Sequence, residues 1–374
     1  MKKNEKKKIL WFSWKDIKNP AAGGAEKIAD VLLSKMAEEG FEVVLLTSRF
    51  KGSGSRERIN GYTVIRQGNR FFVYWKAWRY FRKHLRDWQG LIVEEVNTFP
   101  FFTQFYSNCP RFLFFHQLCR EVWFYELPPP LGWLGYRLEP WYLWALNKNK
   151  VITVSDSTKK DLVKLGFSEN KIKTIPESVD LKPLKNLEDA EKYENPTLLS
   201  LGYMRPMKRV LDKIEIFERA KREIPGLKLV IAGGGKADYK RRVIKRVNDS
   251  KWREDIHYLG SIDKKKKVEI LQKSHIILET SVKEGWGLTV TEAAGQGTPA
   301  VVYDVDGLRE SVVDGKTGLV VENNSPGKAA EAAIELLNNK KRYEKMRKNA
   351  WQESHKFNFE KSYNNFKNII ENNE

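Results

Sequence analysis

Two glutamates on either side of a glycine-rich turn could hold the two ends of an extended ligand that carries phosphate. Glu284 and Glu292 enclose seven residues, 285–291, which begin with Gly-Trp-Gly-Leu-Thr. An apolar run comes before them and a stretch of small residues follows. A helix that begins after such a turn offers unpaired backbone N–H groups and the positive end of its dipole, which suit a phosphate. The order predicts a nucleotide-sugar site, with sugar hydroxyls at Glu284, a diphosphate at the turn and ribose hydroxyls at Glu292.

Helix capping is the alternative explanation for the same two glutamates. The pairs Ser281 with Glu284 and Thr289 with Glu292 both have the spacing of a capping box, in which the glutamate only closes a helix start. Capping does not account for the glycine-rich turn between them, so we favour the ligand site.

Cations suited to a diphosphate follow another apolar run. The segment 201–208 is Leu-Gly-Tyr-Met-Arg-Pro-Met-Lys, and it comes directly after a predicted strand. Gly202 lets the backbone approach a ligand, while Lys208 and Arg205 could stabilise the charge of a leaving diphosphate. The alternative is a loop with solvated charges, and Lys208 is the stronger candidate of the two.

The first half of the chain offers a glycine pair and a histidine. Gly23 and Gly24 lie at a strand-to-helix turn, where N–H groups can point at a ligand, although a tight turn would need the same residues. The turn lacks the G-x-G-x-x-G fingerprint, which argues against NAD. His116 ends an apolar run, and the carboxyl end of a strand is the ligand side of a doubly wound sheet. A structural histidine is the alternative.

Alternating apolar and amphipathic runs predict the elements that position these residues. Such alternation is typical of parallel sheets with crossover helices, and it restarts after a charged, proline-bearing stretch at 178–196 that we interpret as a linker. The predicted strands span 9–14, 42–47, 62–66, 91–95, 112–116, 151–154, 172–175, 197–201, 227–232, 256–259, 275–278, 300–303 and 319–321. The predicted helices span 25–39, 71–88, 132–147, 158–165, 211–223, 239–248, 265–273, 288–295, 329–338, 342–355 and 361–372.

The order and spacing of these motifs resemble the retaining glycosyltransferases of family 4. The resemblance covers nearly the whole chain, and it implies a GT-B fold in which two Rossmann-like, doubly wound parallel-sheet domains face each other across a cleft. It further implies an acceptor-binding domain at 1–180, a nucleotide-sugar-binding domain at 181–355 and a final helix at 356–374 that crosses back to the first domain.

The resemblance also assigns roles to individual residues. It implies that His116, Lys208 and Glu284 are catalytic, and that the donor contacts Gly23, Gly24, Gly202, Arg205, Lys208, Ile262, Glu284, Gly285, Trp286, Gly287, Leu288, Thr289 and Glu292. Tyr203 departs from the pattern, because the family has an arginine there. We expect Arg205 to supply the missing charge.

The implied activity is that of a retaining hexosyltransferase that needs no metal and no cofactor. Its donor would be a UDP- or GDP-linked sugar, and its acceptor a glycolipid or polyprenyl-linked saccharide of the cell envelope. The alternatives are a nucleotide-sugar epimerase or a soluble-acceptor transferase on the same scaffold, or a basic, non-catalytic protein that binds nucleic acid or membrane. We favour the enzyme, and expect no nucleic acid partner.

Composition constrains location and partners. The 374 residues contain two cysteines and no classical zinc spacing, which suits a reducing cytoplasm. The formal net charge of +19 favours anionic partners. In the run 71–88, seven aromatic or leucine residues and four cations, Lys76, Arg79, Lys83 and Arg86, recur at helical spacing. They predict either a helix on an anionic membrane at the inner face of the cell or a core helix with a basic outer side.

Overall fold

The computed structural model describes residues 7–175, 177 and 181–372 of the chain. These residues form two β-sheets, one parallel and one parallel except at a single edge strand, and helices cover both. Two compact units contain them. The first unit holds residues 7–120, 134–175 and 360–372, and the second holds 121–133, 177 and 181–359. The residues 176 and 178–180, where the expected linker begins, lie outside the described residues. The final helix, predicted to return to the first domain, does belong to the first unit.

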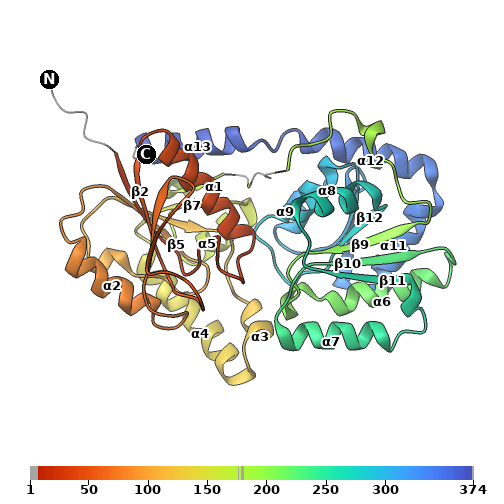
Figure 1. Ribbon diagram of the computed structural model, residues 1–374, viewed down its shortest axis with the longest axis horizontal. Helices are drawn as coiled ribbons and strands as arrows, with labels where there is room; N and C mark the ends of the chain where they lie inside the picture. The colour runs from red at the N-terminus through yellow and green to blue at the C-terminus, as the bar shows by residue number, and fades with distance from the viewer. Residues whose placement is uncertain (1–6, 176, 178–180, 373–374) are drawn as a thin grey trace. The chain divides into compact units, whose positions relative to one another are not determined.

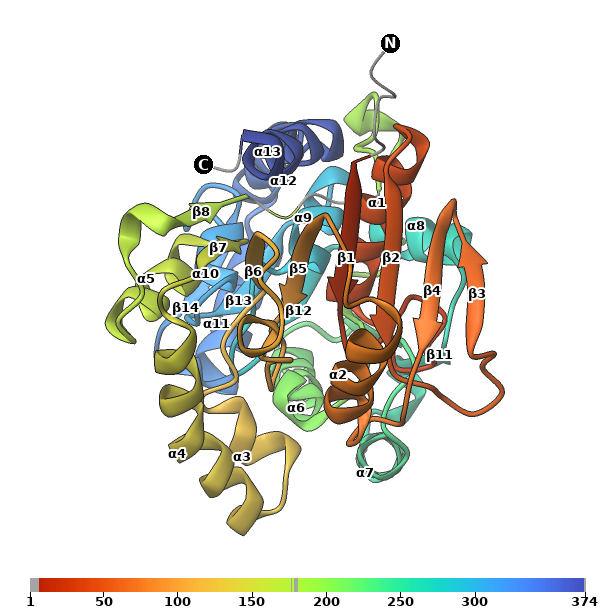
Figure 2. The same cartoon turned by 90° about the vertical axis from the view of Figure 1, so that its left-hand side faces the viewer.

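The first unit is built on a sheet of order β3-β4-β2-β1-β5-β6-β7-β8, seen face-on in Figure 2. Every neighbouring pair is parallel except β3 with β4. Its strands are β1 (Lys8–Phe12), β2 (Glu42–Thr47), β3 (Arg56–Ile59), β4 (Tyr62–Arg66), β5 (Leu91–Glu95), β6 (Arg111–Phe115), β7 (Lys150–Thr153) and β8 (Ile172–Thr174). Its helices are α1 (Gly24–Glu38), α2 (Val73–His84), α5 (Asp156–Lys164) and α13 (Phe359–Asn372), with most of α4 (Pro129–Leu146).

Alternate residues of β1 pack on opposite faces of the first sheet, because side chains in a strand have a period of two. Leu10 and Phe12 join the cluster under α2. The ring of Trp11 points the other way, and its centroid lies 5.9 Å from that of Phe366 on α13.

The second unit has a parallel sheet of order β11-β10-β9-β12-β13-β14. Its strands are β9 (Thr197–Leu201), β10 (Lys228–Ala232), β11 (Ile256–Gly260), β12 (Ile276–Glu279), β13 (Ala300–Tyr303) and β14 (Gly318–Val321). Its helices are α3 (Val122–Glu126), α6 (Val210–Lys221), α7 (Ala237–Asn248), α8 (Lys264–Lys273), α9 (Leu288–Gly295), α10 (Leu308–Ser311), α11 (Pro326–Asn338) and α12 (Lys340–Ser354).

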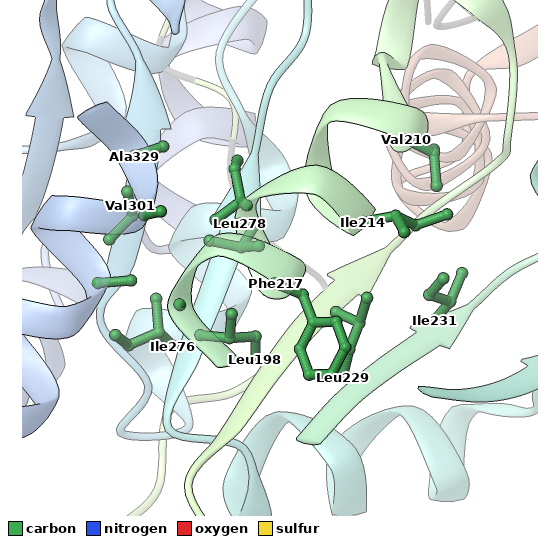
Figure 3. Packing of buried hydrophobic residues seen from close by; sticks show 14 of the residues in the cluster. Leu198, Val210, Ile214, Phe217, Leu229, Ile231, Ile276, Leu278, Val301 and Ala329 are labelled. Atoms are coloured by element: carbon green, nitrogen blue, oxygen red, sulfur yellow. The ribbon is translucent and has the colours of Figure 1, made fainter. Parts of the chain in front are cut away.

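Helices cover both faces of the second sheet, as Figure 1 shows, with α6, α7 and α11 on one side and α8 and α9 on the other. In Figure 3, Phe217 of α6 lies beside Leu198 of β9 and Leu229 of β10, while Ile214 lies nearer to Ile231 of β10. The neighbouring strand residues Leu199 and Val230 face the opposite cluster. Both faces being apolar explains why the strands are continuous hydrophobic runs.

The order of strands reverses once in each sheet. In the second sheet the chain moves outward from β9 to β11 and then returns to the other side of β9 with β12. The loops after β9 and β12 therefore diverge at the switch point, where doubly wound sheets bind their ligands. In the first sheet the corresponding point lies between β1 and β5.

Two predicted features differ from the structure. The helix predicted at 71–88 spans only Val73–His84, and Phe71 and Trp88 lie beyond its ends. Its aromatic residues do not share a face, because Tyr74 and Phe81 pack into the core while Trp75 is 49% exposed. The antiparallel edge strand β3 and the short helix α3 were not predicted at all.

Candidate functional site

The loops after β9 and β12 in the second unit bring together the cations and carboxylates expected to act on a ligand. Lys208 ends a short 3₁₀ turn, Pro206–Lys208, and its Nζ hydrogen-bonds Glu284 Oε1. The Ser281 hydroxyl donates to the same oxygen at 2.5 Å. The backbones are joined as well, since the Val282 N–H donates to Met207 O at 2.9 Å. The site is thus held by main-chain bonds between neighbouring loops.

Glu284 is kept ionised by this setting. Burial raises the pKa of its carboxyl. Lys208, the Ser281 hydroxyl and the charge of Arg205 together lower that pKa by more than burial raises it, so it lies below its ordinary value of 4.5. The side chain of Glu284 is only 14% exposed. The charge of Arg205 therefore acts on the Glu284 carboxylate, and its expected contact with a diphosphate stays a prediction.

The helix expected at the glycine-rich turn begins as predicted. Gly287 is the residue before α9 and has φ of 90°, in the left-handed region that favours glycine. The amides of Val290 and Thr291 donate back to Gly287 O. Those of Leu288 and Thr289 open the helix, where no earlier turn offers a carbonyl. Two such amides and the positive end of the helix dipole are groups that can bind an anion.

The capping explanation for the two glutamates is wrong. Neither Ser281 nor Thr289 is the residue that caps a helix, because the only helix here, α9, starts at Leu288 after Gly287. Ser281 bonds the Glu284 side chain instead of a backbone amide.

Glycines allow a third loop to close against this turn. A Cβ on Gly307 would lie 2.3 Å from Glu284 O, so only glycine fits there. The Glu284 N–H donates to Asp306 O at 3.1 Å, and Lys283 Nζ bonds the Asp306 carboxylate at 2.8 Å. The loop after β13 thus fixes the backbone that carries Glu284, and Asp306 is occupied by Lys283.

A buried ion pair that the sequence did not reveal lies beneath the helix start. Lys213 Nζ on α6 donates to Glu279 Oε2 at 3.0 Å, and both side chains are 2% exposed or less. The Thr289 hydroxyl donates to the other oxygen of Glu279 at 2.6 Å. Thr289 was expected to contact a ligand, but its hydroxyl holds the first turn of α9 to β12.

Two further expected residues also have partners within the protein. Trp286 is 8% exposed, its Nε1 donates to Thr291 Oγ1 at 3.1 Å, and its ring lies edge-on to Phe357. The side chain of Trp286 therefore anchors the turn. Glu292 Oε1 accepts from Lys267 Nζ on α8 at 2.5 Å. Ile262 lies in the loop before α8, half-buried against the core.

The loop after β9 is also fixed to the loop after β10. Gly202 has φ of 134°. A Cβ on Gly233 would lie 1.9 Å from the carbonyl oxygen of Gly202. Met204 N–H donates to Gly234 O at 2.7 Å. Close packing of glycine backbones therefore sets where Arg205 lies.

In the first unit, His116 follows β6 and lies against a buried carboxylate. Its Nε2 is 3.3 Å from Glu95 Oε1, and Glu95 also accepts from Trp11 Nε1 at 3.1 Å and Asn97 Nδ2 at 2.7 Å. Burial raises the pKa of Glu95, but His116 and the other donors lower it by more. The sequence predicted His116 at the end of this strand and missed the glutamate beside it, and the catalytic role of His116 stays a prediction.

One of the two glycine amides expected to point at a ligand is bonded within the protein. The Gly23 N–H donates to Glu26 Oε2 at 2.6 Å, so this amide is bonded within the first turn of α1. Glu26 is buried and also pairs with Lys15 at 3.0 Å. Gly24 is the first residue of α1.

Fold and site together define a two-unit α/β protein. In its second sheet, a glycine-rich turn and the N-terminus of a helix lie at the point where the strand order reverses. Family models match both halves: the model of Glycosyltransferase Family 4 at residues 22–183 and that of Glycosyl transferases group 1 at 185–353. The chain therefore belongs to the group 1 glycosyltransferases with a GT-B fold.

Individual relatives are distant. Trehalose synthase of Thermococcus litoralis is 28% identical over 209 residues, 51% of this chain, so the chain spans only about half, 50%, of that relative. Among solved structures, sucrose-phosphate synthase from Thermosynechococcus elongatus has a TM-score of 0.80 at 18% identity, covering 98% of this chain and 99% of that one. Anabaena Alr3699/HepE, solved with UDP-glucose, has a TM-score of 0.72 at 14% identity, with 98% and 99% covered.

Proposed function

We propose that this protein is a retaining glycosyltransferase that moves a sugar from a nucleoside-diphosphate sugar to an acceptor hydroxyl. The observation that carries the proposal is the joining of Lys208 and Glu284 beside the first turn of α9. A cation and free amides suit a diphosphate, and an ionised carboxylate next to them suits sugar hydroxyls. A structural relative solved with UDP-glucose supports this donor class.

In the proposed reaction, no side chain of the protein forms a covalent bond with the sugar. The bond between the anomeric carbon and the phosphate oxygen breaks, and the acceptor oxygen bonds that carbon from the same face. A donor phosphate oxygen takes the acceptor's proton. Lys208, Arg205 and the amides of Leu288 and Thr289 would stabilise the charge on the departing diphosphate, without a metal. Glu284 would orient the sugar, and Glu292 the ribose.

The experiment measures thermal stability with a panel of UDP- and GDP-sugars, followed by turnover with the sugar that stabilises most. A ligand that binds the native state raises stability by mass action. We expect Glu284→Gln to abolish turnover, whereas Glu331→Gln, which breaks an exposed Lys–Glu pair in the same unit, should leave it intact. No stabilisation by any nucleotide-sugar would refute the proposal.

We further propose that the acceptor is a glycolipid or polyprenyl-linked saccharide reached at an anionic membrane surface. On α4, Leu134, Leu138, Trp141 and Trp144 follow helical spacing, and each is at least 47% exposed. Beyond the start of α2, Phe71 and Phe72 are 76% and 57% exposed. Large aromatic residues in this number on one unit are typical of a surface that contacts lipid or a partner.

Ring contacts connect α2 and α4, the helices next to which these two exposed groups lie. Phe99 is 41% exposed, and its ring centroid lies 5.3 Å from Tyr74 of α2 and 5.4 Å from Tyr142 of α4. The cations Lys76 and Arg79 lie over the Trp75 ring. Cations beside aromatic residues favour an anionic bilayer interface. Among the described residues, no helix is both long and apolar enough to cross a membrane.

Co-sedimentation with vesicles that contain anionic lipid tests the membrane contact. Each cation near such a surface contributes about 1 kcal/mol of binding. We therefore expect replacing Lys76, Arg79, Lys83 and Arg86 by glutamine, or Trp141 and Trp144 by alanine, to reduce binding strongly. The matched control replaces the same number of cations on α7: Lys240, Arg241, Arg242 and Lys245. Equal loss in this control would show general charge attraction and would overturn the proposed surface.

A further inference from the structure

A third carboxylate, Glu126, lies among the cations of the second unit. It ends α3, in the segment 121–133, which belongs to the second unit although its neighbours Arg120 and Leu134 belong to the first. Lys236 Nζ hydrogen-bonds Glu126 Oε2, and Arg205 Nε lies 3.9 Å from Oε1. The Glu126 side chain is 15% exposed. Its Oε1 is buried and accepts no hydrogen bond from the described part of the chain.

Lys236 is held beside Arg205 by the backbone. It follows the Gly233-Gly234-Gly235 turn after β10, and its N–H donates to Met204 O at 3.0 Å. Because β10 is the parallel neighbour of β9, the loop after β10 leaves the sheet at the same edge as the loop after β9, which carries both Arg205 and Lys208. The side chains of Lys236 and Arg205 are each 37% exposed, so both can reach a ligand.

We propose that Lys236 is a further phosphate-binding cation of the donor site, and that Glu126 is an internal anion occupying Lys236 and Arg205 until the donor diphosphate replaces it. The inference rests on the proposed function, because it assigns a partner to the same site. Nothing in the family resemblance or in the predicted motifs singled out either residue.

The physical reason is competition between anions for the same cations. A carboxylate and a diphosphate that both contact Arg205 and Lys236 would repel each other, and a buried charge without a partner is costly. One of the two anions therefore leaves. The apparent affinity for the donor is reduced by the fraction of molecules in which Glu126 occupies the site. By linkage, a bound diphosphate must release α3 to the same extent.

A purely structural role for Glu126 makes the opposite prediction. If Glu126 only attached α3 to the second unit, its loss would loosen the segment and leave phosphate affinity unchanged or weaker.

Calorimetric titration of the full chain with inorganic pyrophosphate distinguishes these roles. We expect Glu126→Gln to bind pyrophosphate roughly tenfold more tightly than the wild type, in the range typical of coupled sites. Lys236→Met should bind more weakly. The matched control is Glu121→Gln, which removes an equal charge from the exposed residue before α3. When Glu126→Gln is combined with Lys236→Met, the gain in pyrophosphate affinity from Glu126→Gln should be smaller, because one of the two cations that Glu126 contacts is gone.

Hydrogen exchange of the wild type provides a second measurement that needs no variant. Amides of residues 122–127 should exchange faster when pyrophosphate is bound, because α3 is released. Pyrophosphate binding that Glu126→Gln leaves unchanged or weakens, or unaltered exchange in α3, would overturn this inference alone. Absence of pyrophosphate binding by every variant would overturn both this inference and the proposed donor site.

Discussion

At the scale of single residues, the state of Glu284 depends on three neighbours that come from two loops. Lys208 and Ser281 bond the same oxygen of its carboxylate, and Arg205 adds charge. Burial acts against ionisation but is outweighed, so the pKa of Glu284 is lowered. The interaction that lowers the pKa of Glu284 also occupies Lys208, so the proposed donor would have to separate two side chains that attract each other.

The lowered pKa of Glu284 predicts a pH dependence of stability. On acidification the unfolded chain takes up the proton first, so the pair contributes fully above about pH 5 and its contribution is lost as pH falls through the depressed folded pKa. The difference in melting temperature between wild type and Glu284→Gln should be constant near neutrality and shrink in acid. Thermal melts of both proteins from pH 8 to 3.5 measure it. A difference that grew in acid would contradict the pairing.

The sequence revealed the residues of this site that follow strands, and missed those that arrive from other elements. Lys208, Glu284 and the start of α9 could be predicted because loops after parallel strands gather at one edge of a sheet. Lys213 could not, because one cation on an amphipathic helix looks like a solvated residue until its partner is known. Glu126 could not be predicted either, because it follows three aromatic residues at 123–125 and only the fold brings it to Lys236.

At the scale of elements, the start of α9 depends on a buried pair between α6 and β12. Lys213 bonds Glu279, and Glu279 accepts from the Thr289 hydroxyl in the first turn of α9. Burial lowers the pKa of Lys213, and Glu279 opposes that effect. The first turn of α9 is therefore positioned by two opposite charges that are buried beneath it.

Removing one partner of this buried pair should be costly. Lys213→Met leaves Glu279 as an unpaired buried charge, for which a loss of about 3–5 kcal/mol is typical. The double variant Lys213→Met with Glu279→Leu removes both charges and should recover much of the loss. Urea unfolding measures the three proteins. Equal destabilisation by the single and double variants would mean that lost packing, and not the unpaired charge, sets the cost.

Most strands were predicted within a residue or two, because both faces of each sheet are apolar and glycine or proline breaks the runs. The failures have physical causes. Strand β3 is an edge strand with a pattern too charged to recognise. The helix predicted at 71–88 is longer than the observed Val73–His84, because aromatic residues beyond its ends continue the helical spacing of those on its core side.

At the scale of the whole molecule, each compact unit contains a segment from the other half of the sequence. The C-terminal helix α13 follows the second unit in sequence and belongs to the first. Tyr363 and Phe366 are buried there, and Phe366 lies against Trp11 of the central strand β1. Lys367 pairs with Glu39 at 2.7 Å, and Glu371 with Lys7 at 2.7 Å. The first unit is therefore completed by α13, which follows the second unit in sequence.

This arrangement predicts that damage to α13 destabilises the first unit selectively. Phe366→Ala removes a buried ring, for which about 3–5 kcal/mol is typical. Because the ring packs against β1, hydrogen exchange should rise in β1 and its neighbours β2 and β5, while β9 and β12 keep their protection. The control is Phe105→Ala, since Phe105 is 68% exposed in the first unit and should have little effect. Equal loss of protection in both sheets would show that the units unfold together, and α13 would then stabilise the chain as a whole instead of its first unit.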